Sequence, residues 1–306
     1  MLQLLKWRKL INAVIVLFGV SIIVFLLMYL TGDPVALLLP MDASLEDAEM
    51  LRESLGLNDP LWQQYLRFAG QAVRGDFGVS LRHHQPALPM ILAKMPATIE
   101  LTLAGMAVAL LIAIPLGIIT AVKSNTVIDY FGSLAALIGQ SMPVFWLGLM
   151  LLYLVGVKWD LLPINGRGSW QNLILPAITV GAYTAATIVR LLRSRMLEVM
   201  QQDYIKTARA KGVKKNLIII KHALRNALLP VITILGMQLG VLLGGAVITE
   251  TIFSWPGVGR FMIQSIHNRD LPVVQAGVFV LASCIVIINL LTDVIYSWLD
   301  PRIKYE

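Results

Sequence analysis

Few polar residues of this 306-residue chain could carry chemistry, and they do not form a catalytic set. His83 and His84 are adjacent, which allows at most a transient metal contact, whereas His222 and His267 belong to other connecting segments. Cys284 is the only cysteine and lies in an apolar run, so it cannot form a disulfide within the chain. We therefore expect no catalytic residue and no metal site.

A nucleotide-binding site is not expected either. A phosphate cradle of the G-x-x-x-x-G-K-[ST] type needs a Gly-Lys dipeptide, because its backbone N–H groups and its lysine hold the phosphates. The sequence contains no Gly-Lys dipeptide. We expect that this chain binds no cofactor.

A basic stretch between two apolar runs stands out and covers residues 203–230, DYIKTARAKGVKKNLIIIKHALRNALLP. Asp203 is its only acid, and small alanines stand on both sides of Arg209. Two helix-forming stretches flank Gly212, which can end the first of them in the left-handed conformation. The pattern predicts a helix–glycine–helix hairpin within residues 194–228 that fits a groove on another protein. A basic loop that only fixes the topology and touches anionic lipid is the alternative.

The rest of the chain is strongly apolar. Hydrophobic residues make up 57% of the whole sequence and charged residues 14%, and its mean hydropathy is +0.75; in soluble domains about a quarter of the residues are charged. A spanning helix needs about 20 apolar residues and satisfies its own backbone groups in hydrocarbon. Six stretches without Asp, Glu, Lys or Arg therefore predict an all-α membrane protein with six transmembrane helices. They are residues 10–30, 101–122, 131–157, 173–189, 227–249 and 271–292.

Basic residues follow the fourth of these stretches and precede the first. The fourth is short, and we expect its helix to continue to Arg190 or Arg193, with those side chains reaching toward the lipid headgroups. The first follows basic residues, as a signal peptide would, but it is longer than a signal h-region and no small-x-small cleavage site follows it. We expect a retained helix.

The distribution of Lys and Arg predicts the orientation. Residues 190–225 hold ten of the 25 basic residues, which places this segment in the cytoplasm together with both termini. The loop 31–96 has eight acids and five bases and falls outside. The net charge of +7 and the pI near 9.6 are thus explained by topology, and we expect no nucleic-acid partner.

The outer loop contains one helix signal. Ser44 with Asp47 is typical of a helix start, and Gly56 is placed to end that helix. We expect a short external helix and then irregular chain over residues 56–80. Such a loop either covers helix ends or contacts substrate.

The sequence offers no energy source of its own for transport. A proton-coupled carrier usually places Asp, Glu or His inside its spans, and the six stretches contain none. Asp293, at the inner end of the last stretch, is expected to be interfacial. We therefore expect that energy arrives from a separate cytoplasmic protein that docks on the basic hairpin. A channel or facilitator without an ATPase and a membrane scaffold without transport are the alternatives.

Polar and small residues inside the stretches mark a pathway and a packing surface. Gln140 and Ser141 precede Pro143, which frees a backbone carbonyl that is tolerated only against protein or a wet cavity. With Gln238, these two are our candidate substrate-pathway residues, and simple hydrogen bonds between helices are the alternative. A stripe of glycines spaced by four predicts close helix packing, either with a partner subunit or within the chain. The stripe is Gly236, Gly240 and Gly244.

The hairpin, with Pro230 after it, resembles the cytoplasmic coupling motif, the EAA loop, of type I ABC importer permeases. The segment is similar to the variant in the dipeptide, oligopeptide and nickel permease branch, in its B-type subunits. Lys206 stands where the general motif has an acid, whereas Gly212 is retained. Further segments resemble family blocks and occur in the family's order. They are TGDP at 31–34, GLNDPLWQQY at 56–65, GDFGVS at 75–80, MPATIELTL at 95–103, ETIFSWPGVGR at 250–260 and NRDLPVVQA at 268–276.

The resemblance implies the type I permease fold and a division of the chain. Residues 1–94 would hold the first helix and the external loop, residues 95–298 the permease core with the coupling loop 194–228, and residues 299–306 a cytoplasmic tail. Thr207, Ala208 and Gly212 match positions of the family pattern. The expected ATPase-coupling residues are Asp203, Tyr204, Thr207, Ala208, Arg209, Ala210 and Gly212.

The resemblance also implies the partners and the cargo. This chain would pair with a paralogous permease subunit as a heterodimer in the lipid of the bacterial inner membrane. Two cytoplasmic subunits would bind ATP and Mg, and an extracytoplasmic substrate-binding protein would deliver the cargo by alternating access. Di- and oligopeptides are the expected cargo; nickel, a nickel-chelate complex, glutathione or an opine are the alternatives.

Overall fold

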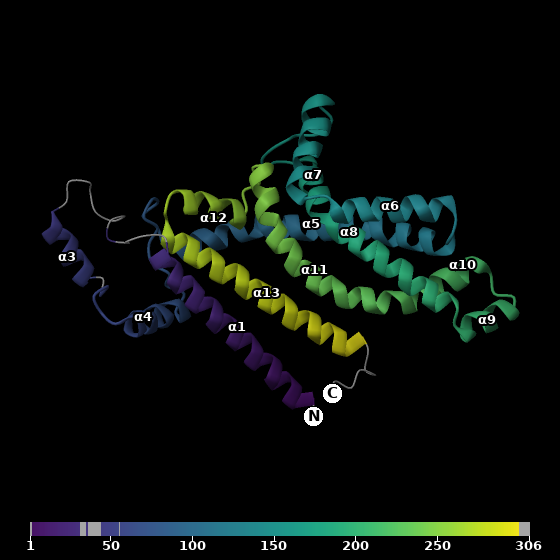
Figure 1. Cartoon of the computed structure of the whole chain (residues 1–306), viewed down its shortest axis with the longest axis horizontal. Helices are drawn as coiled ribbons and strands as arrows, with labels where there is room; N and C mark the ends of the chain where they lie inside the picture. Colours follow the sequence, from purple (N-terminus) through teal and green to yellow (C-terminus); the bar gives the residue numbers. More distant parts are fainter. Residues whose placement is uncertain (1, 31–34, 36–43, 55, 300–306) are drawn as a thin grey trace. The chain divides into compact units, whose positions relative to one another are not determined.

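A computed structural model of the chain describes residues 2–30, 35, 44–54 and 56–299. Within these ranges every regular element is a helix, apart from an isolated bridge between Val79 and Pro86. The sequence block at 31–34 and residues 300–306 of the expected tail lie outside the described residues. The helices are α1 (Leu2–Leu30), α3 (Leu45–Ser54), α4 (Leu61–Val73), α5 (Ala87–Val122), α6 (Val127–Ser141), α7 (Val144–Leu151), η1 (Leu152–Lys158), α8 (Gln171–Met200), α9 (Asp203–Ala210), α10 (Lys215–Leu217), η2 (Ile218–Leu224), α11 (Arg225–Ile252), α12 (Val258–His267) and α13 (Leu271–Leu299) (Figure 1).

The prediction of an all-α membrane protein is confirmed. Five helical segments are long and apolar enough to cross a membrane, and each corresponds to one of the predicted stretches. They are Lys9–Leu27, Ala87–Val122, Gln171–Met200, Lys215–Ile252 and Leu271–Val294. The count reaches six when the bent pair Val127–Ser141 and Val144–Lys158 is taken as one span.

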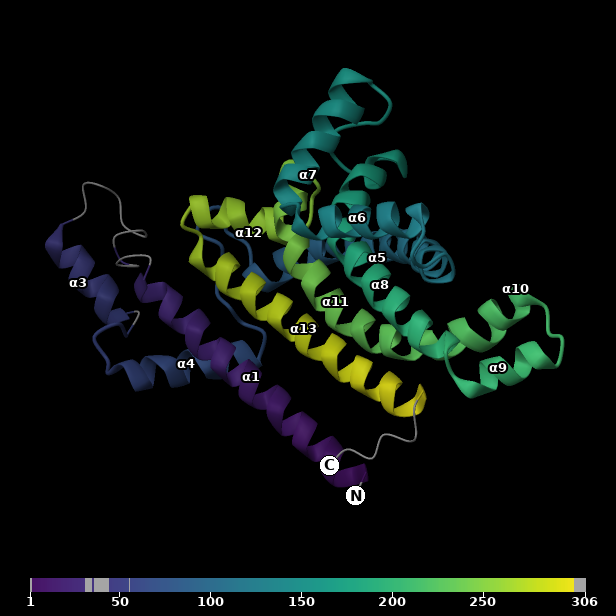
Figure 2. The same cartoon turned by 45° about the vertical axis from the view of Figure 1, so that its right-hand side comes forward.

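The third apolar stretch, residues 131–157, was expected to form one helix, but the structure shows a bent pair of helical segments. Helix α6 ends at Ser141, and the segment from Val144 to Lys158 continues at an angle of 105° to it (Figure 2). Pro143 causes the break, because it has no N–H to donate and disfavours the helical conformation in the residue before it. Met142 accordingly has the extended angles φ −78 and ψ 125.

The short helix expected after Ser44 is confirmed as α3 (Leu45–Ser54); its location outside the membrane stays a prediction. The Asp47 N–H donates to Ser44 Oγ at 3.1 Å, and the Ser44 N–H donates to Asp47 Oδ2 at 3.0 Å, so the two side chains cap the helix reciprocally. The Ser44 hydroxyl also donates to this carboxylate and lowers the pKa of Asp47. Gly56 takes a φ of +64 after the end of the helix, as expected.

The expectation of irregular chain over residues 56–80 is wrong, because α4 occupies Leu61–Val73. The helix forms since Tyr65 and Phe68 lie one turn apart and both have aromatic partners. The Tyr65 ring packs edge-on against Phe25 of α1 at 5.6 Å between centroids, and Phe68 lies 6.4 Å from Phe77. The apolar spacing of this segment was a usable helix signal.

The chain divides into two compact units. The first comprises residues 1–96 and 257–287. Its buried core joins the start of α5 to α12 and α13. The core residues are Ala72, Phe77, Ala87, Ile91, Met95, Val258, Met262, Val273 and Ala276.

The second unit comprises residues 97–256 and 288–306, and α8 is its central helix. Helix α8 packs against α6, α7 and α11, and α6 and α11 run beside it in both views (Figures 1 and 2). Beyond the end of α8, the helices α9 and α10 form a hairpin that leads back into α11. The side chains of Leu192, Met196, Ile205 and Ile218 are buried where this hairpin meets α8.

Candidate functional site

The candidate coupling site is the hairpin formed by α9 and the helical segment that starts at Lys215. Gly212 has a φ of +76, and its N–H donates to the Arg209 carbonyl at 3.0 Å. The Val213 N–H donates to the Ala208 carbonyl at 3.2 Å. These two bonds form a Schellman motif with glycine at its left-handed position. The prediction that Gly212 ends the first helix in the left-handed conformation is confirmed.

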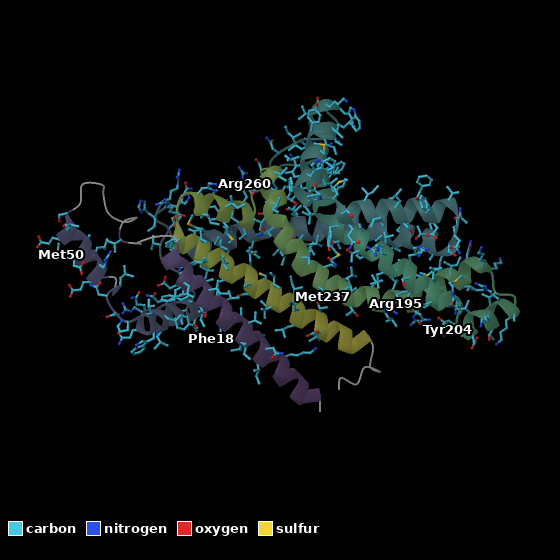
Figure 3. All side chains as sticks on the ribbon, viewed as in Figure 1. Phe18, Met50, Arg195, Tyr204, Met237 and Arg260 are labelled. Atoms are coloured by element: carbon cyan, nitrogen blue, oxygen red, sulfur yellow. The ribbon has the colours of Figure 1, made fainter. Side chains whose placement is uncertain are left out.

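The hairpin is exposed on one side and anchored on the other. Of the seven expected coupling residues, Ala208 is half-buried and the other six are exposed. Ile205, between them, is fully buried against the end of α8. The Asn226 amide donates to Tyr204 Oη at 2.8 Å, which ties α9 to the start of α11. Tyr204 lies on the hairpin beyond Arg195 of α8 in the side-chain view (Figure 3). The structure therefore brings the expected coupling residues together on one short, surface-exposed element.

The three candidate pathway residues have different surroundings. Gln140 and Ser141 lie in the last turn of α6, next to the break at Pro143. Gln140 accepts a hydrogen bond from the Arg190 guanidinium of α8. Gln238 of α11 is buried and accepts a hydrogen bond from Thr184 Oγ1 at 3.3 Å. Gln238 therefore lies between α8 and α11, whereas Gln140 faces another side of α8. Their role in a pathway stays a prediction.

The glycines of the α11 stripe also differ in how closely other parts of the chain approach them. A Cβ added to Gly236 would collide with the Thr292 side chain of α13, so this glycine is used for packing within the chain. A Cβ added to Gly244 would meet no atom within 4 Å, and Gly240 between them is half-buried. One end of the stripe is thus covered by the chain itself, and the other is open.

An ion pair that the sequence analysis missed joins α6 to α8. Arg193 donates from Nε to Asp129 Oδ1 at 2.6 Å and from Nη2 to Oδ2 at 2.7 Å. The Asn125 N–H and the Ser133 hydroxyl also donate to this carboxylate, at 2.9 Å and 3.2 Å. The expectation that Arg193 reaches toward lipid headgroups is wrong, because its guanidinium is held by Asp129. No local signal links these residues, since they lie 64 positions apart.

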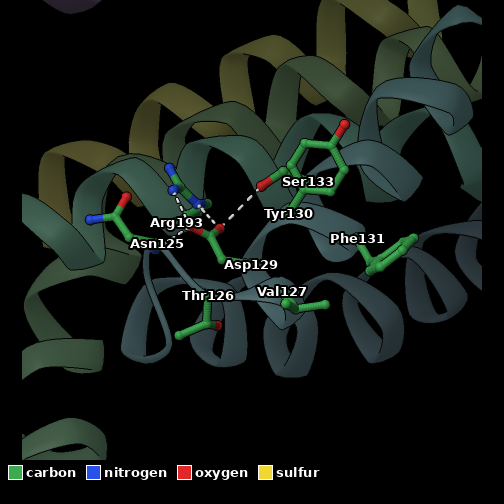
Figure 4. A pocket seen from close by; sticks show the side chains of 8 residues that line it. All are labelled: Asn125, Thr126, Val127, Asp129, Tyr130, Phe131, Ser133 and Arg193. Carbon is green, nitrogen blue, oxygen red and sulfur yellow. Dashed lines mark hydrogen bonds and ion pairs between the residues drawn. The ribbon is translucent and has the colours of Figure 1, made fainter.

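A hollow of about 700 Å³ opens beside this ion pair (Figure 4). Asn125, Thr126, Val127, Asp129, Tyr130, Phe131, Ser133 and Arg193 line it. Tyr130 and Phe131 are mostly exposed, and their rings pack edge-on at 5.9 Å between centroids. The two charged side chains in this hollow are already paired with each other, so the hollow presents a mainly apolar and aromatic surface with uncharged polar groups.

Four of the sequence blocks that resemble the family meet in pairs, one pair within each unit. In the first unit, block 75–80 meets block 268–276: the Ser80 hydroxyl and the Leu81 N–H both donate to the buried Asp270 carboxylate, at 2.5 Å and 3.1 Å. In the second unit, block 95–103 meets block 250–260.

In that second pair, the Thr98 hydroxyl donates to Glu250 Oε1 at 2.6 Å, and Trp255 Nε1 donates to the Ala97 carbonyl at 2.8 Å. Glu250 and Trp255 are almost fully buried. These blocks therefore hold distant helices together. The described residues contain no group of three or more His, Cys, Asp or Glu that could hold a metal ion.

The fold and the hairpin are those of a membrane-spanning transport component, and comparison with known proteins identifies the family. Residues 113–305 match the family of binding-protein-dependent transport system inner membrane components, and residues 1–102 match the N-terminal part of such components. The chain belongs to this family. It is an inner-membrane permease component, which is not itself catalytic.

Several relatives are similar over nearly their whole length. The dipeptide transport system permease protein DppB of Alkalihalophilus pseudofirmus is 42% identical over 97% of this chain and 98% of its own. DppB of Escherichia coli K12 is 41% identical over 94% and 95%. The glutathione transport system permease protein GsiC of E. coli K12 is 39% identical over 98% of both chains.

Solved structures share the fold. An inward-facing form of the MetNI methionine ABC transporter has a TM-score of 0.56 at 18% identity, over 69% of this chain and 96% of the other. An amino acid ABC transporter crystallised with histidines has a TM-score of 0.52 at 16% identity, over 70% and 94%. The expected permease fold is therefore confirmed.

Proposed function

We propose that this chain is a transmembrane subunit of an ATP-driven, binding-protein-dependent importer of short peptides. The exposed, anchored hairpin at Gly212 is the observation that carries the proposal, because a permease without a nucleotide site needs a surface that receives force from outside the membrane. Relatives named for dipeptide and glutathione transport support peptide cargo. No observation favours nickel, a nickel-chelate complex or an opine.

The proposed assembly has four kinds of component. This chain pairs with a paralogous permease subunit in the lipid bilayer, and the open part of the glycine stripe at Gly244 is available for that contact. Two cytoplasmic subunits bind ATP and Mg, and a binding protein delivers peptide on the opposite side. The hairpin and both termini then face the cytoplasm, as the surplus of Lys and Arg in residues 190–225 indicates.

The way in which the hairpin joins the spans supports a mechanical role. From Lys215 to Ile252 the chain is one continuous helical segment of 38 residues, and α8 ends only two residues before α9 begins. Buried Ile205 and Ile218 fix the hairpin to these helices. A helix is stiff along its axis, so a displacement of the hairpin tilts α8 and α11 with it. In this mechanism, closure of the ATP-binding subunits moves the hairpin and opens the path to the outside.

Replacement of Gly212 tests the proposal. Gly212→Val forces a β-branched residue into the left-handed region, which costs about 1–2 kcal/mol and displaces the Schellman turn. Gly166→Val is a matched control, because Gly166 has a φ of +78 and an added Cβ there also meets no atom within 4 Å. We expect Gly212→Val to reduce co-purification of the ATP-binding subunits and ATP-driven dipeptide uptake in proteoliposomes. The Gly166→Val complex should stay assembled.

The proposal fails if Gly212→Val and Gly166→Val complexes assemble and import equally well. It fails also if vesicles that contain this chain alone pass dipeptide down a gradient at the rate of the full complex, which would indicate a facilitator.

A further inference from the structure

Helix α8 carries a polar face that neighbouring helices do not cover. Tyr183, Thr187, Arg190 and Ser194 are spaced by four, three and four residues, so their side chains lie on one face of the helix. Tyr183 is 36% exposed, Thr187 is half-buried, and Arg190 and Ser194 are exposed. The opposite face, with Thr184, Ile188 and Leu192 among others, is buried in the unit.

The exposed faces of the neighbouring spans are different. Helix α6 exposes Phe131, Leu134, Leu137 and Ile138, and α11 exposes Met237 and Val241. Such side chains suit lipid tails. Polar and charged side chains in a spanning helix instead face a water-filled cavity or another protein. The polar face of α8 is therefore not a lipid-facing surface.

The charge of Arg190 has no acidic partner in the part of the chain that the structure describes. Its bonding partner is the Gln140 amide oxygen, which is neutral. The Asp129 carboxylate is already held by two guanidinium nitrogens of Arg193, Nε and Nη2. A guanidinium has five N–H donors, so a bond to Gln140 leaves donors free for another acceptor.

The Arg190 side chain also points toward the interior of the span. A Cβ added to Gly139, next to Gln140, would lie 3.5 Å from Ala186 Cβ and 3.9 Å from the Ala182 carbonyl oxygen. Gln140 is therefore level with Ala182 and Ala186, one to two turns farther from the hairpin than Arg190. Arg190 itself lies ten residues, about 15 Å, before the end of α8 at Met200. An arginine that faced lipid would reach toward the near interface instead.

We infer that this polar face lines the peptide path and that Arg190 binds the free α-carboxylate of a passing peptide. The inference rests on the proposed function and adds a site to it. A guanidinium and a carboxylate match in charge and in fork geometry. The site is open to water and has a single charge, so it holds a peptide weakly enough to release it, as a path requires. Gln140 is a positioning residue that orients Arg190.

Cysteine labelling in the assembled importer tests the inference. In a Cys284→Ala background, Thr187→Cys and Ser194→Cys are each reconstituted with the partner permease, the ATP-binding subunits and the binding protein in proteoliposomes. We expect hydrophilic methanethiosulfonate reagents to label both positions, and di-alanine, but not its C-terminal amide, to slow the reaction. Leu137→Cys, on the apolar face of α6, should not react.

The charge of Arg190 gives a quantitative readout. Thr187 is three residues away, with about 6 Å between the side chains, so the Arg190 charge should favour an anionic over a cationic reagent by about tenfold in water. Arg190→Gln should abolish this preference, Arg190→Lys should keep most of it, and Arg195→Gln, near the end of α8, should leave it unchanged. Arg190→Gln should also lower di-alanine uptake severalfold.

Two results overturn the inference. One is the absence of labelling at both positions in a complex that imports di-alanine, which would place the face against lipid or the partner subunit. The other is labelling whose charge preference and peptide protection do not change in Arg190→Gln. Failure of the unaltered complex to import di-alanine with ATP would instead contradict the proposed function.

Discussion

Removal of the Asp129 charge should destabilise the second unit, because it leaves the Arg193 guanidinium between α6 and α8 without its partner. The side chains of Asp129 and Arg193 are 7% and 29% exposed, and two short bonds join them. Loss of one partner of a buried ion pair costs about 3–5 kcal/mol. Since water still reaches part of Arg193, we expect about 2–3 kcal/mol for Asp129→Asn.

The assay is the apparent unfolding temperature of the purified chain in detergent, followed by tryptophan fluorescence. At about 2–4 °C for each kcal/mol in a protein of this size, Asp129→Asn should lower it by about 4 °C or more. Arg195→Gln is the control. It breaks the Arg195–Glu198 pair, whose side chains are 44% and 54% exposed, and an exposed pair contributes less than about 1 kcal/mol.

A double-mutant cycle decides whether the pair itself carries the effect. Arg193→Gln alone should also destabilise the chain, and the combined Asp129→Asn and Arg193→Gln variant should lose less than the sum of the two single losses. The reasoning is refuted if Asp129→Asn lowers the unfolding temperature no more than Arg195→Gln does, or if the two single effects are additive.

Three further outcomes are expected. Trp255→Phe should cost about 1–2 kcal/mol, because it removes a buried hydrogen bond to a backbone carbonyl; an unchanged unfolding temperature would contradict this. Gly236→Ala should destabilise the isolated chain by about 1–3 kcal/mol, because the added methyl group collides with Thr292. Gly244→Ala should leave the stability of the isolated chain unchanged or raise it, and should weaken only the pull-down of the partner permease. Hydrogen bonds from Ser44 hold the pKa of Asp47 below its ordinary value, so the charged cap should stabilise α3 above that ordinary value and be lost as the pH falls through the lowered pKa. Amide exchange in α3 should show this loss, and Asp47→Asn should not show it.

The sequence predicted the features that depend on neighbours along the chain. Apolar runs marked the spans, Ser44 with Asp47 marked the start of α3, and Gly212 marked the turn of the hairpin, because each signal lies within a few residues of the structure it specifies. Helix α4 was missed although its spacing was readable. The sequence analysis noted Pro143, but it did not predict the change of chain direction that this proline causes.

The pairing of residues from distant helices could not be read in this way. Asp129 and Arg193 each looked like ordinary charges near a helix end, and the expectation for Arg193 was wrong for that reason. Gln140 and Gln238 looked alike in sequence, yet one faces Arg190 and the other is buried against Thr184. Their surroundings depend on the rotation and register of α8 relative to α6 and α11.

The sequence by itself thus determined the class of protein, the spans and the hairpin, because backbone hydrogen bonding in hydrocarbon and glycine stereochemistry act locally. Only the tertiary structure decided that, among the residues it describes, Arg193 has an acidic partner and Arg190 has none. That difference arises from side-chain contacts across α6 and α8, whose geometry is fixed by packing and not by the order of residues along either helix.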